Sequence, residues 1–227
     1  MHDFKYDPDR KREIFNLIDQ GEGEKLDFKF AVNDARKIAK TLSAFANTKG
    51  GTLLIGVKDS GRVSGIDPEE EAHMISSAAE VYSDPKIPLS LHCHDFEGKW
   101  VLEVQVPESS EKPHLVKNRD EKSLAFFRFE DHTIPANGVL LKLWSLKQNP
   151  KVQTQLSFTS AEKAALKFLE KEGPKSFSQI KKVHKGSLIQ ITEFLAQLLA
   201  WSIVEITWST EGYKYLINEN PVKKTRD

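Results

Sequence analysis

The apolar run Thr52–Val57 is the feature that most constrains the fold. It reads TLLIGV, and its mixture of β-branched and large aliphatic side chains is typical of a strand. A run this apolar does not suit a sheet edge, so we predict a central strand. Helical spacing of apolar residues predicts one helix before this strand in the sequence, at Asp34–Asn47, and one after it, at Pro68–Tyr82. The pattern predicts an α+β domain with a mixed sheet.

A turn signature follows the central strand. Asp59-Ser60-Gly61 is typical of a tight turn, and Arg62–Ile66 would return beside Thr52–Val57 as the second strand of a hairpin. The same periodicities predict further strands at 25–30, 90–95, 100–106 and 124–129, and further helices at 9–20 and 138–146.

The last third of the chain carries three helices and a hairpin in quick succession. Capping boxes at Thr159–Glu162 and Ser176–Gln179 open the first two helices, and Ser187 begins a third that runs to Ala200. Strands are predicted at 203–208 and 213–217. Helix, short helix, turn, helix and hairpin is the order of a winged helix-turn-helix domain.

A polar segment separates the two patterns. Asn149–Gln155 contains Pro150 and lacks periodicity, so we place the domain boundary there. The sequence thus predicts a first domain at 1–149, a linker at 150–155, a winged helix at 156–219 and a disordered tail at 220–227.

Lysines of the winged helix are the candidate nucleic-acid contacts. Its third helix would expose Gln190, Thr192, Glu193 and Gln197, which are polar but not basic. Positive charge comes instead from Lys181 and Lys182 of the second helix, Lys185 of the turn and Lys214 of the wing. We expect these four lysines and Gln190 to contact double-stranded DNA. The alternative is a winged helix used for dimerisation or partner docking.

Composition excludes several classes of protein. The 33 Lys and Arg residues balance 33 Asp and Glu residues, so no net charge draws the chain to polyanions and contacts must be local. No apolar run approaches the roughly 18 residues that cross a bilayer, and no signal peptide is evident. Cys93 is the only cysteine, which excludes an internal disulfide. We therefore expect a cytoplasmic protein without a membrane segment.

A glycine pair precedes the central strand. Asn47, Gly50 and Gly51 lie between the predicted helix and strand, where glycine permits positive φ and close backbone approach. Exposed amides there could hold a phosphate or another ligand, or the glycines serve only a tight connection. No Walker loop occurs anywhere in the chain.

Two sequence blocks carry a family resemblance. GEGEKLDFKF and KTLSAFANTKGGTLLIGVKDSGRVSGI, with the later KPHLVKN and AFFRFEDHTIPAN, resemble the Schlafen AlbA-type domain over about Ile14 to Leu146. The resemblance is to the bacterial members, and with the winged helix it implies a DNA-binding transcription regulator. Schlafen nucleases join two related lobes into a cradle, so a chain with one lobe is expected to form a homodimer.

The resemblance also implies an acidic site. Glu22, Asp27 and Asp59 match the three carboxylates of Schlafen-type RNA nucleases, which would hold Mg²⁺ or Mn²⁺ for phosphodiester cleavage. Asp27 stands where the family usually has Glu, and the shorter side chain would displace a metal ligand by about 1 Å. A metal-dependent ribonuclease is therefore the alternative function. Alternatively, each carboxylate has a purely structural role: Asp59 in a turn, Asp27 on a solvated strand face and Glu22 in a loop.

Overall fold

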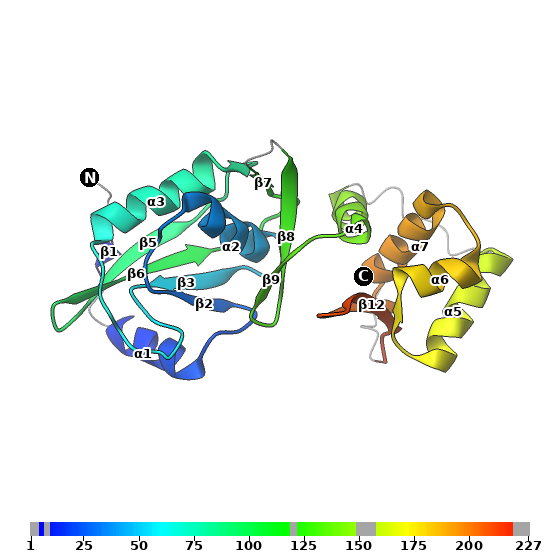
Figure 1. Ribbon diagram of the computed structural model, residues 1–227, viewed down its shortest axis with the longest axis horizontal. Helices are drawn as coiled ribbons and strands as arrows, with labels where there is room; N and C mark the ends of the chain where they lie inside the picture. Colours follow the sequence, from blue (N-terminus) through cyan, green and yellow to red (C-terminus); the bar gives the residue numbers. More distant parts are fainter. Residues whose placement is uncertain (1–4, 7–9, 119–121, 149–157, 220–227) are drawn as a thin grey trace, which may run out of the picture. The chain divides into compact units, whose positions relative to one another are not determined.

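The computed structural model describes residues 5–6, 10–118, 122–148 and 158–219. They form two compact units that divide between Ala136 and Asn137 (Figure 1). The helices and strands of the first unit are β1 (Lys5–Tyr6), α1 (Arg10–Gln20), β2 (Leu26–Lys29), α2 (Ala35–Asn47), β3 (Gly51–Ile55), α3 (Pro68–Glu80), β4 (Ser83–Asp84), β5 (Ser90–Phe96), β6 (Lys99–Val106), β7 (Leu115–Lys117), β8 (Ser123–Phe129) and β9 (His132–Pro135). Those of the second are α4 (Gly138–Gln148), α5 (Ser160–Glu172), β10 (Lys175–Ser176), α6 (Phe177–His184), α7 (Leu188–Ala200), β11 (Val204–Ser209) and β12 (Gly212–Ile217).

The main sheet of the first unit is mixed, as predicted. Its strand order is β1-β5-β6-β3-β2. Strand β3, the predicted central strand, pairs in parallel with β2 and antiparallel with β6. The hairpin predicted with Arg62–Ile66 is wrong for β3, because both sides of β3 are taken by these strands. Residues 62–65 return only beside residues 56–58, through a Val57–Val63 bridge and a few backbone hydrogen bonds.

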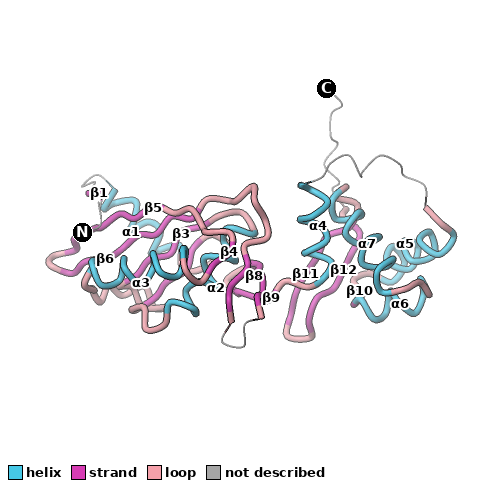
Figure 2. Tube along the Cα trace, turned by 90° about the horizontal axis from the view of Figure 1, so that it is seen from above, coloured by secondary structure: helices cyan, strands magenta, loops and turns pink. Residues whose placement is uncertain are grey.

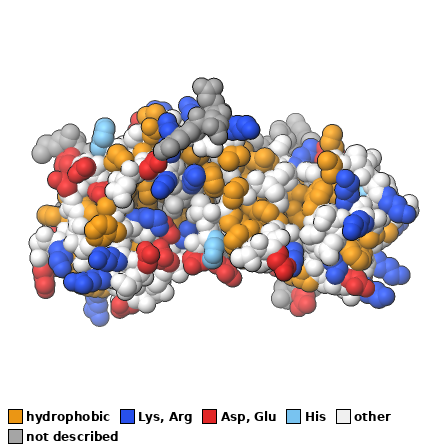
Figure 3. Space-filling model, viewed as in Figure 1, with side chains coloured by type: hydrophobic (Ala, Val, Ile, Leu, Met, Phe, Trp, Pro, Cys, Tyr) orange, Lys and Arg blue, Asp and Glu red, His pale blue; other side chains and the backbone are white. Residues whose placement is uncertain are grey.

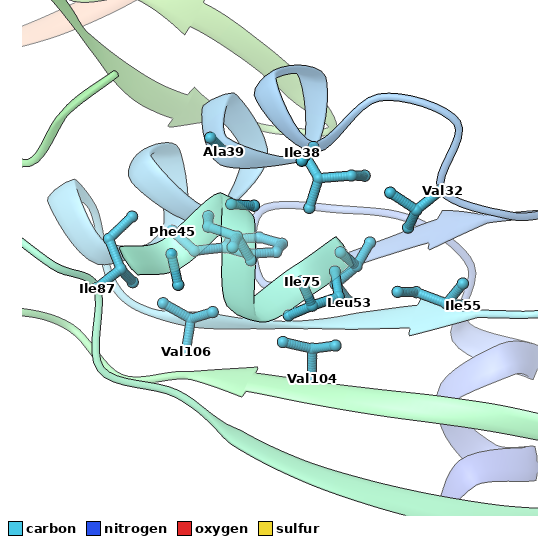
Figure 4. Packing of buried hydrophobic residues seen from close by; sticks show 14 of the residues in the cluster. Val32, Ile38, Ala39, Phe45, Leu53, Ile55, Ile75, Ile87, Val104 and Val106 are labelled. Atoms are coloured by element: carbon cyan, nitrogen blue, oxygen red, sulfur yellow. The ribbon is translucent and has the colours of Figure 1, made fainter. Parts of the chain in front are cut away.

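Helices cover both faces of this sheet. Helices α2 and α3 pack on one face, and α1 lies against the other (Figure 1). Figure 4 shows Phe45 and Ile75 of these two helices meeting Leu53 and Val104 of the sheet. Because helices cover both faces of the sheet, side chains on both sides of β3 are buried, and its sequence is a continuous apolar run.

Much of the outer face of helix α2 is also buried, because a second sheet covers it. This antiparallel sheet has the order β4-β7-β8-β9. Asn47 ties the two together: its Nδ2 donates to the carbonyls of His114 and Phe126, each at 3.0 Å, and its Oδ1 accepts the His114 N–H at 2.7 Å. Ser43 adds a 2.7 Å bond to the same His114 carbonyl.

The second unit contains the helices and hairpin that the sequence predicts. Capping boxes at Thr159, Ser176 and Ser187 open α5, α6 and α7, which confirms those three helix starts. Strands β11 and β12 form the hairpin, and the two-residue strand β10, which lies between α5 and α6, joins β12 to complete a three-stranded sheet.

Helix α4 belongs to the second unit, although the predicted boundary at 149 put it in the first domain. It packs along α7 (Figure 2), and Lys142 Nζ lies 2.7 Å from Glu193 Oε1. The contact face of α7 carries Ala196 and Ala200, whose small side chains allow close helix approach. Polarity marks the end of a helix, not the unit it packs on, which is why the sequence misplaced this boundary. The predicted linker and tail lie outside the described residues.

Candidate functional site: an acid pair and exposed lysines

Glu22 and Asp27 lie together at the start of β2. The Glu22 carboxylate accepts the backbone N–H of Phe28 at 2.8 Å, which turns it back toward the strand. Asp27 lies within the strand and is 4% exposed, so it is not the solvated strand residue that its sequence context allows. The structure therefore brings two of the three predicted carboxylates to one place.

Two cations neutralise Asp27. Arg128 Nη2 donates to its Oδ1 at 3.0 Å, and Lys29 Nζ lies 2.7 Å from its Oδ2. Arg128 is 1% exposed and also donates to the carbonyls of Gly23 and Leu26. Its guanidinium lies over the ring of Phe45. A buried charge needs this many partners because unpaired burial costs several kcal/mol, on the order of 3–5.

Asp59 does not join the pair. It lies in the exposed turn after β3, and within the described residues no three His, Cys, Asp or Glu side chains gather closely enough to hold a metal ion. Both Asp27 oxygens already face cations, which would repel a divalent ion. The residues present therefore do not fit Mg²⁺ or Mn²⁺.

The environment of Glu22 raises its pKa. Burial is the largest cause, and the adjacent Asp27 carboxylate adds to it by charge repulsion and by sharing a hydrogen bond. The Phe28 N–H and the Lys29 charge oppose the increase without cancelling it. The Asp27 charge therefore makes ionisation of Glu22 less favourable.

The predicted ligand loop serves the fold. The Asn47 amide is saturated by the second sheet, and the Gly50 N–H donates to the Phe45 carbonyl at 2.9 Å. Gly50 has φ +70°, and a Cβ there would lie 2.7 Å from the Glu108 nitrogen. At Gly51 a Cβ would collide with the ring of Phe45. Close packing thus accounts for both glycines, and the donors of Asn47 and Gly50 are not open to a phosphate.

The predicted DNA-contact residues divide into two groups. Lys181, Lys182 and Lys185 are exposed, the first two in the last turn of α6 and the third at its end. Lys214 instead pairs with Glu211 at 2.6 Å, and Gln190 Oε1 accepts the Ser187 N–H at 2.9 Å within the capping box. The last two side chains therefore have local structural roles.

A second buried polar cluster escaped the sequence analysis. Glu103 of β6 is fully buried and accepts bonds from Arg10, His94 and Gln105 at 2.8–2.9 Å. Burial by itself raises the pKa of Glu103, but the bonds from His94 and Gln105 and the charge of Arg10 outweigh it and lower the pKa. Alternating polar residues on β5 and β6 were the only signal for this cluster, and they resemble an exposed strand face.

Basic and acidic side chains are mixed on the face of the molecule that Figure 3 shows. In the view of Figure 3, Lys and Arg side chains are interspersed with Asp and Glu, in keeping with the zero net charge. No described helix combines the length and apolar character needed to cross a bilayer.

Comparison with known proteins identifies the family of the first unit. The family model described as Schlafen, AlbA_2 matches residues 22–137, just over half of the chain. No curated protein matches. Among solved structures, the N-terminal domain of a RecG-related protein from Nitrosomonas europaea is 25% identical, with a TM-score of 0.42, and the match covers 51% of this chain and 86% of that one.

The DIP2311 protein from Corynebacterium diphtheriae is 17% identical with a TM-score of 0.43, and the match covers 87% of this chain and 34% of that one. At these TM-scores the likeness does not establish a common fold. The match to the family model does not depend on these structures, and it confirms the family resemblance that the sequence blocks carry. The chain therefore belongs to the Schlafen, AlbA_2 family.

Proposed function

We propose that this chain binds nucleic acid and that its second unit is a winged helix holding duplex DNA by its phosphates. The observation that carries the proposal is the group of exposed lysines at the α6–α7 turn, Lys181, Lys182 and Lys185. None of them pairs with a carboxylate in the described part of the chain. Helix-turn-helix domains place this region beside the DNA backbone.

The order of elements supports the winged-helix assignment. Helices α5, α6 and α7 are followed by the hairpin β11–β12, and β10 joins the hairpin from between the first two helices. Lys185 has φ 57°, the left-handed conformation that ends α6, and Ser187 caps α7 two residues later. This gives the tight turn that a helix-turn-helix requires.

Helix α4 limits how α7 reads DNA. The buried side chains Ile191, Leu195 and Leu198 place the core on one side of α7, and Glu193, Ala196 and Ala200 lie on the opposite side. That opposite side faces the major groove in helix-turn-helix proteins. Because Glu193 pairs with Lys142 and Ala196 is fully buried, α4 covers much of this side. We therefore propose binding that is mostly independent of sequence.

Regulation of transcription is the biological role we propose for this binding. A homodimer would bring two winged helices to one duplex. Light scattering at micromolar concentration tests the dimer: a mass of twice the 25.8 kDa chain is expected, and a monomer at all concentrations would rule it out.

A protein-interaction role has one observation in its favour. Leu188 and Ile189 at the start of α7 are 57% and 71% exposed, which is unusual for large aliphatic side chains. A metal-dependent ribonuclease is not favoured by the geometry of Asp27.

The test is the salt dependence of duplex binding. Each lost phosphate contact should reduce the slope of log K against log salt by about 0.9, so Lys181→Ala/Lys182→Ala/Lys185→Ala should lower it by roughly two to three. The matched control changes Lys163, Lys167 and Lys171, three exposed lysines of α5, to Ala. Equal slopes for the wild type and the α6 variant would place the DNA elsewhere.

A further inference from the structure

A cleft of about 400 Å³ lies between α2 and the β7–β8 strands of the first unit. Its walls carry four cations, Arg36, Lys37 and Lys40 from α2 and Lys117 from β7. Apolar side chains complete the lining, among them Leu124 and Phe126 of β8. The cleft is separate from the acid pair, since neither Glu22 nor Asp27 lines it.

The four cations lack carboxylate partners within the described residues. None forms an ion pair there, whereas Lys29, Lys49, Lys112 and Arg128 of the same unit do. One carboxylate, that of Asp34, also lines the cleft, so the lining carries four positive charges and one negative charge, a net of +3. Mutual repulsion of this kind is relieved by an anion with more than one charge.

Two of the cations are held in place by aromatic rings. The Lys40 ammonium lies 5.6 Å from the centroid of Phe126, and the Arg36 guanidinium lies 5.0 Å from that of Tyr82. Such contacts fix long side chains without neutralising them. Lys37 and Lys117 are exposed and remain able to move onto a ligand. The cleft therefore combines prepositioned and adaptable cations.

Side chains, not the helix terminus, would hold the anion. The Asp34 carboxylate accepts the Arg36 N–H at 2.9 Å, and the Asp34 carbonyl accepts the N–H groups of Lys37 and Ile38. These amides at the start of α2 are consequently occupied. A ligand must match the lysine and arginine side chains at the rim and the apolar surface of Leu124, which is 43% exposed.

We propose that this cleft binds the phosphate groups of a nucleotide, with the nucleoside lying on the apolar floor. The volume lies within the roughly 300–1,000 Å³ of small-molecule sites, and mixed cationic and apolar lining matches a ligand with a charged and a flat apolar part. Two sources share this chemistry: a free nucleotide and the 5′-phosphorylated end of a single strand. The site is independent of duplex binding by the second unit.

Calorimetry on the full chain tests the proposal, with ATP as the probe. Lys37→Glu/Lys117→Glu should weaken ATP binding roughly tenfold or more, because two charge-assisted contacts become repulsive. The matched control Lys25→Glu/Lys99→Glu makes the same charge change at exposed lysines outside the cleft and should stay within about twofold. Adenosine should bind more weakly than ATP, and inorganic triphosphate should also lose affinity in the cleft variant.

A second arm separates the two sources. A single strand of about eight nucleotides is compared with and without a 5′-phosphate; a preference for the phosphorylated strand that disappears in the cleft variant assigns the site to strand ends. ATP binding without that preference assigns it to free nucleotides. Equal ATP and strand affinities in the cleft and control variants, or no binding of either probe to the wild type, would overturn the proposal.

The proposals for duplex binding and for nucleotide binding are tested by different variants, so either can fail without the other. Lys181→Ala/Lys182→Ala/Lys185→Ala should leave ATP affinity unchanged, and Lys37→Glu/Lys117→Glu should leave the salt slope of duplex binding unchanged. All of these lysines are exposed, and melting curves of each variant establish that it is folded.

Discussion

Asp27 and Arg128 are 101 positions apart in the sequence and 3.0 Å apart in the structure. Their pairing decides what the acidic site is. An unpaired Asp27 next to Glu22 would be a candidate metal ligand, whereas a paired Asp27 fixes the start of β2 to the second sheet. Arg128 performs this role through five hydrogen bonds to four acceptors, which are the Asp27 carboxylate, the Thr133 hydroxyl and two backbone carbonyls.

The pairing predicts a large loss of stability when one partner is removed. Arg128→Leu leaves Asp27 buried without its guanidinium and should lower the free energy of unfolding by about 3–5 kcal/mol in urea denaturation. Adding Asp27→Asn removes the stranded charge, so the double variant should recover roughly 1 kcal/mol or more. Additive losses in the double variant would contradict a direct pairing.

Glu22 gives a pH dependence of known sign. Because its pKa is raised on folding, the folded protein holds a proton that the unfolded chain has released at pH values between the ordinary and the raised pKa. This contribution to stability is therefore present at low pH and is lost as the pH rises through that window. Glu22→Gln cannot titrate and should lose less stability than the wild type between pH 4 and pH 7, measured by urea unfolding at both. A parallel loss in both proteins would place the titration on another group.

At the scale of elements, α2 organises the first unit. It is covered by the main sheet on one side and by the β4-β7-β8-β9 sheet on the other, so its buried polar side chains must find partners inside the protein. Ser43, Asn47 and the C-cap residue Thr48 bond to strand β8 and to His114, which precedes β7. The asparagine that the sequence places in a ligand loop is one of these internal links.

Loss of this link should destabilise the unit. Asn47→Ala leaves the His114 N–H and the Phe126 carbonyl without their buried partner and should cost about 3 kcal/mol or more in urea unfolding. Asn33→Ala, at an exposed asparagine of the same unit, is the control and should change stability by less than about 0.5 kcal/mol. Equal effects would mean that Asn47 is not a structural link.

At the scale of the whole molecule, the division between Ala136 and Asn137 assigns α4 to the second unit. Five of its large side chains are buried: Val139, Leu140, Leu143, Trp144 and Leu146. A helix that covers α7 therefore belongs to the same structural unit as the proposed winged helix, and we expect the stability and the proposed DNA contacts of that unit to depend on it.

Fragments test this division. Residues 137–219 keep α4, whereas residues 158–219 expose Ala196, Ala200 and their apolar surroundings to water. The longer fragment should melt higher by at least about 5 °C, followed by circular dichroism, because burial of each large apolar side chain contributes about 1.5–3 kcal/mol. The same melting temperature for both fragments would mean that α4 does not stabilise the second unit, which would contradict its assignment to that unit.

The sequence by itself determined the elements whose signals are local. A capping box spans only four residues, so Thr159, Ser176 and Ser187 predict the helices that follow them. The continuous apolar run TLLIGV likewise predicts a buried strand. The family signature likewise lies in contiguous blocks. Helix starts, the central strand and the family were therefore readable without a structure.

Tertiary structure alone decided what the charged and polar residues do. Asp27, Glu103 and Asn47 look like solvated or ligand-binding residues in sequence, and they are buried because partners distant along the chain, such as Arg128, Arg10 and His114, reach them. The cost of burying a charge or an amide depends on those partners, not on its neighbours in sequence. For the same reason, helix α4 could not be assigned to either unit until its packing against α7 was known.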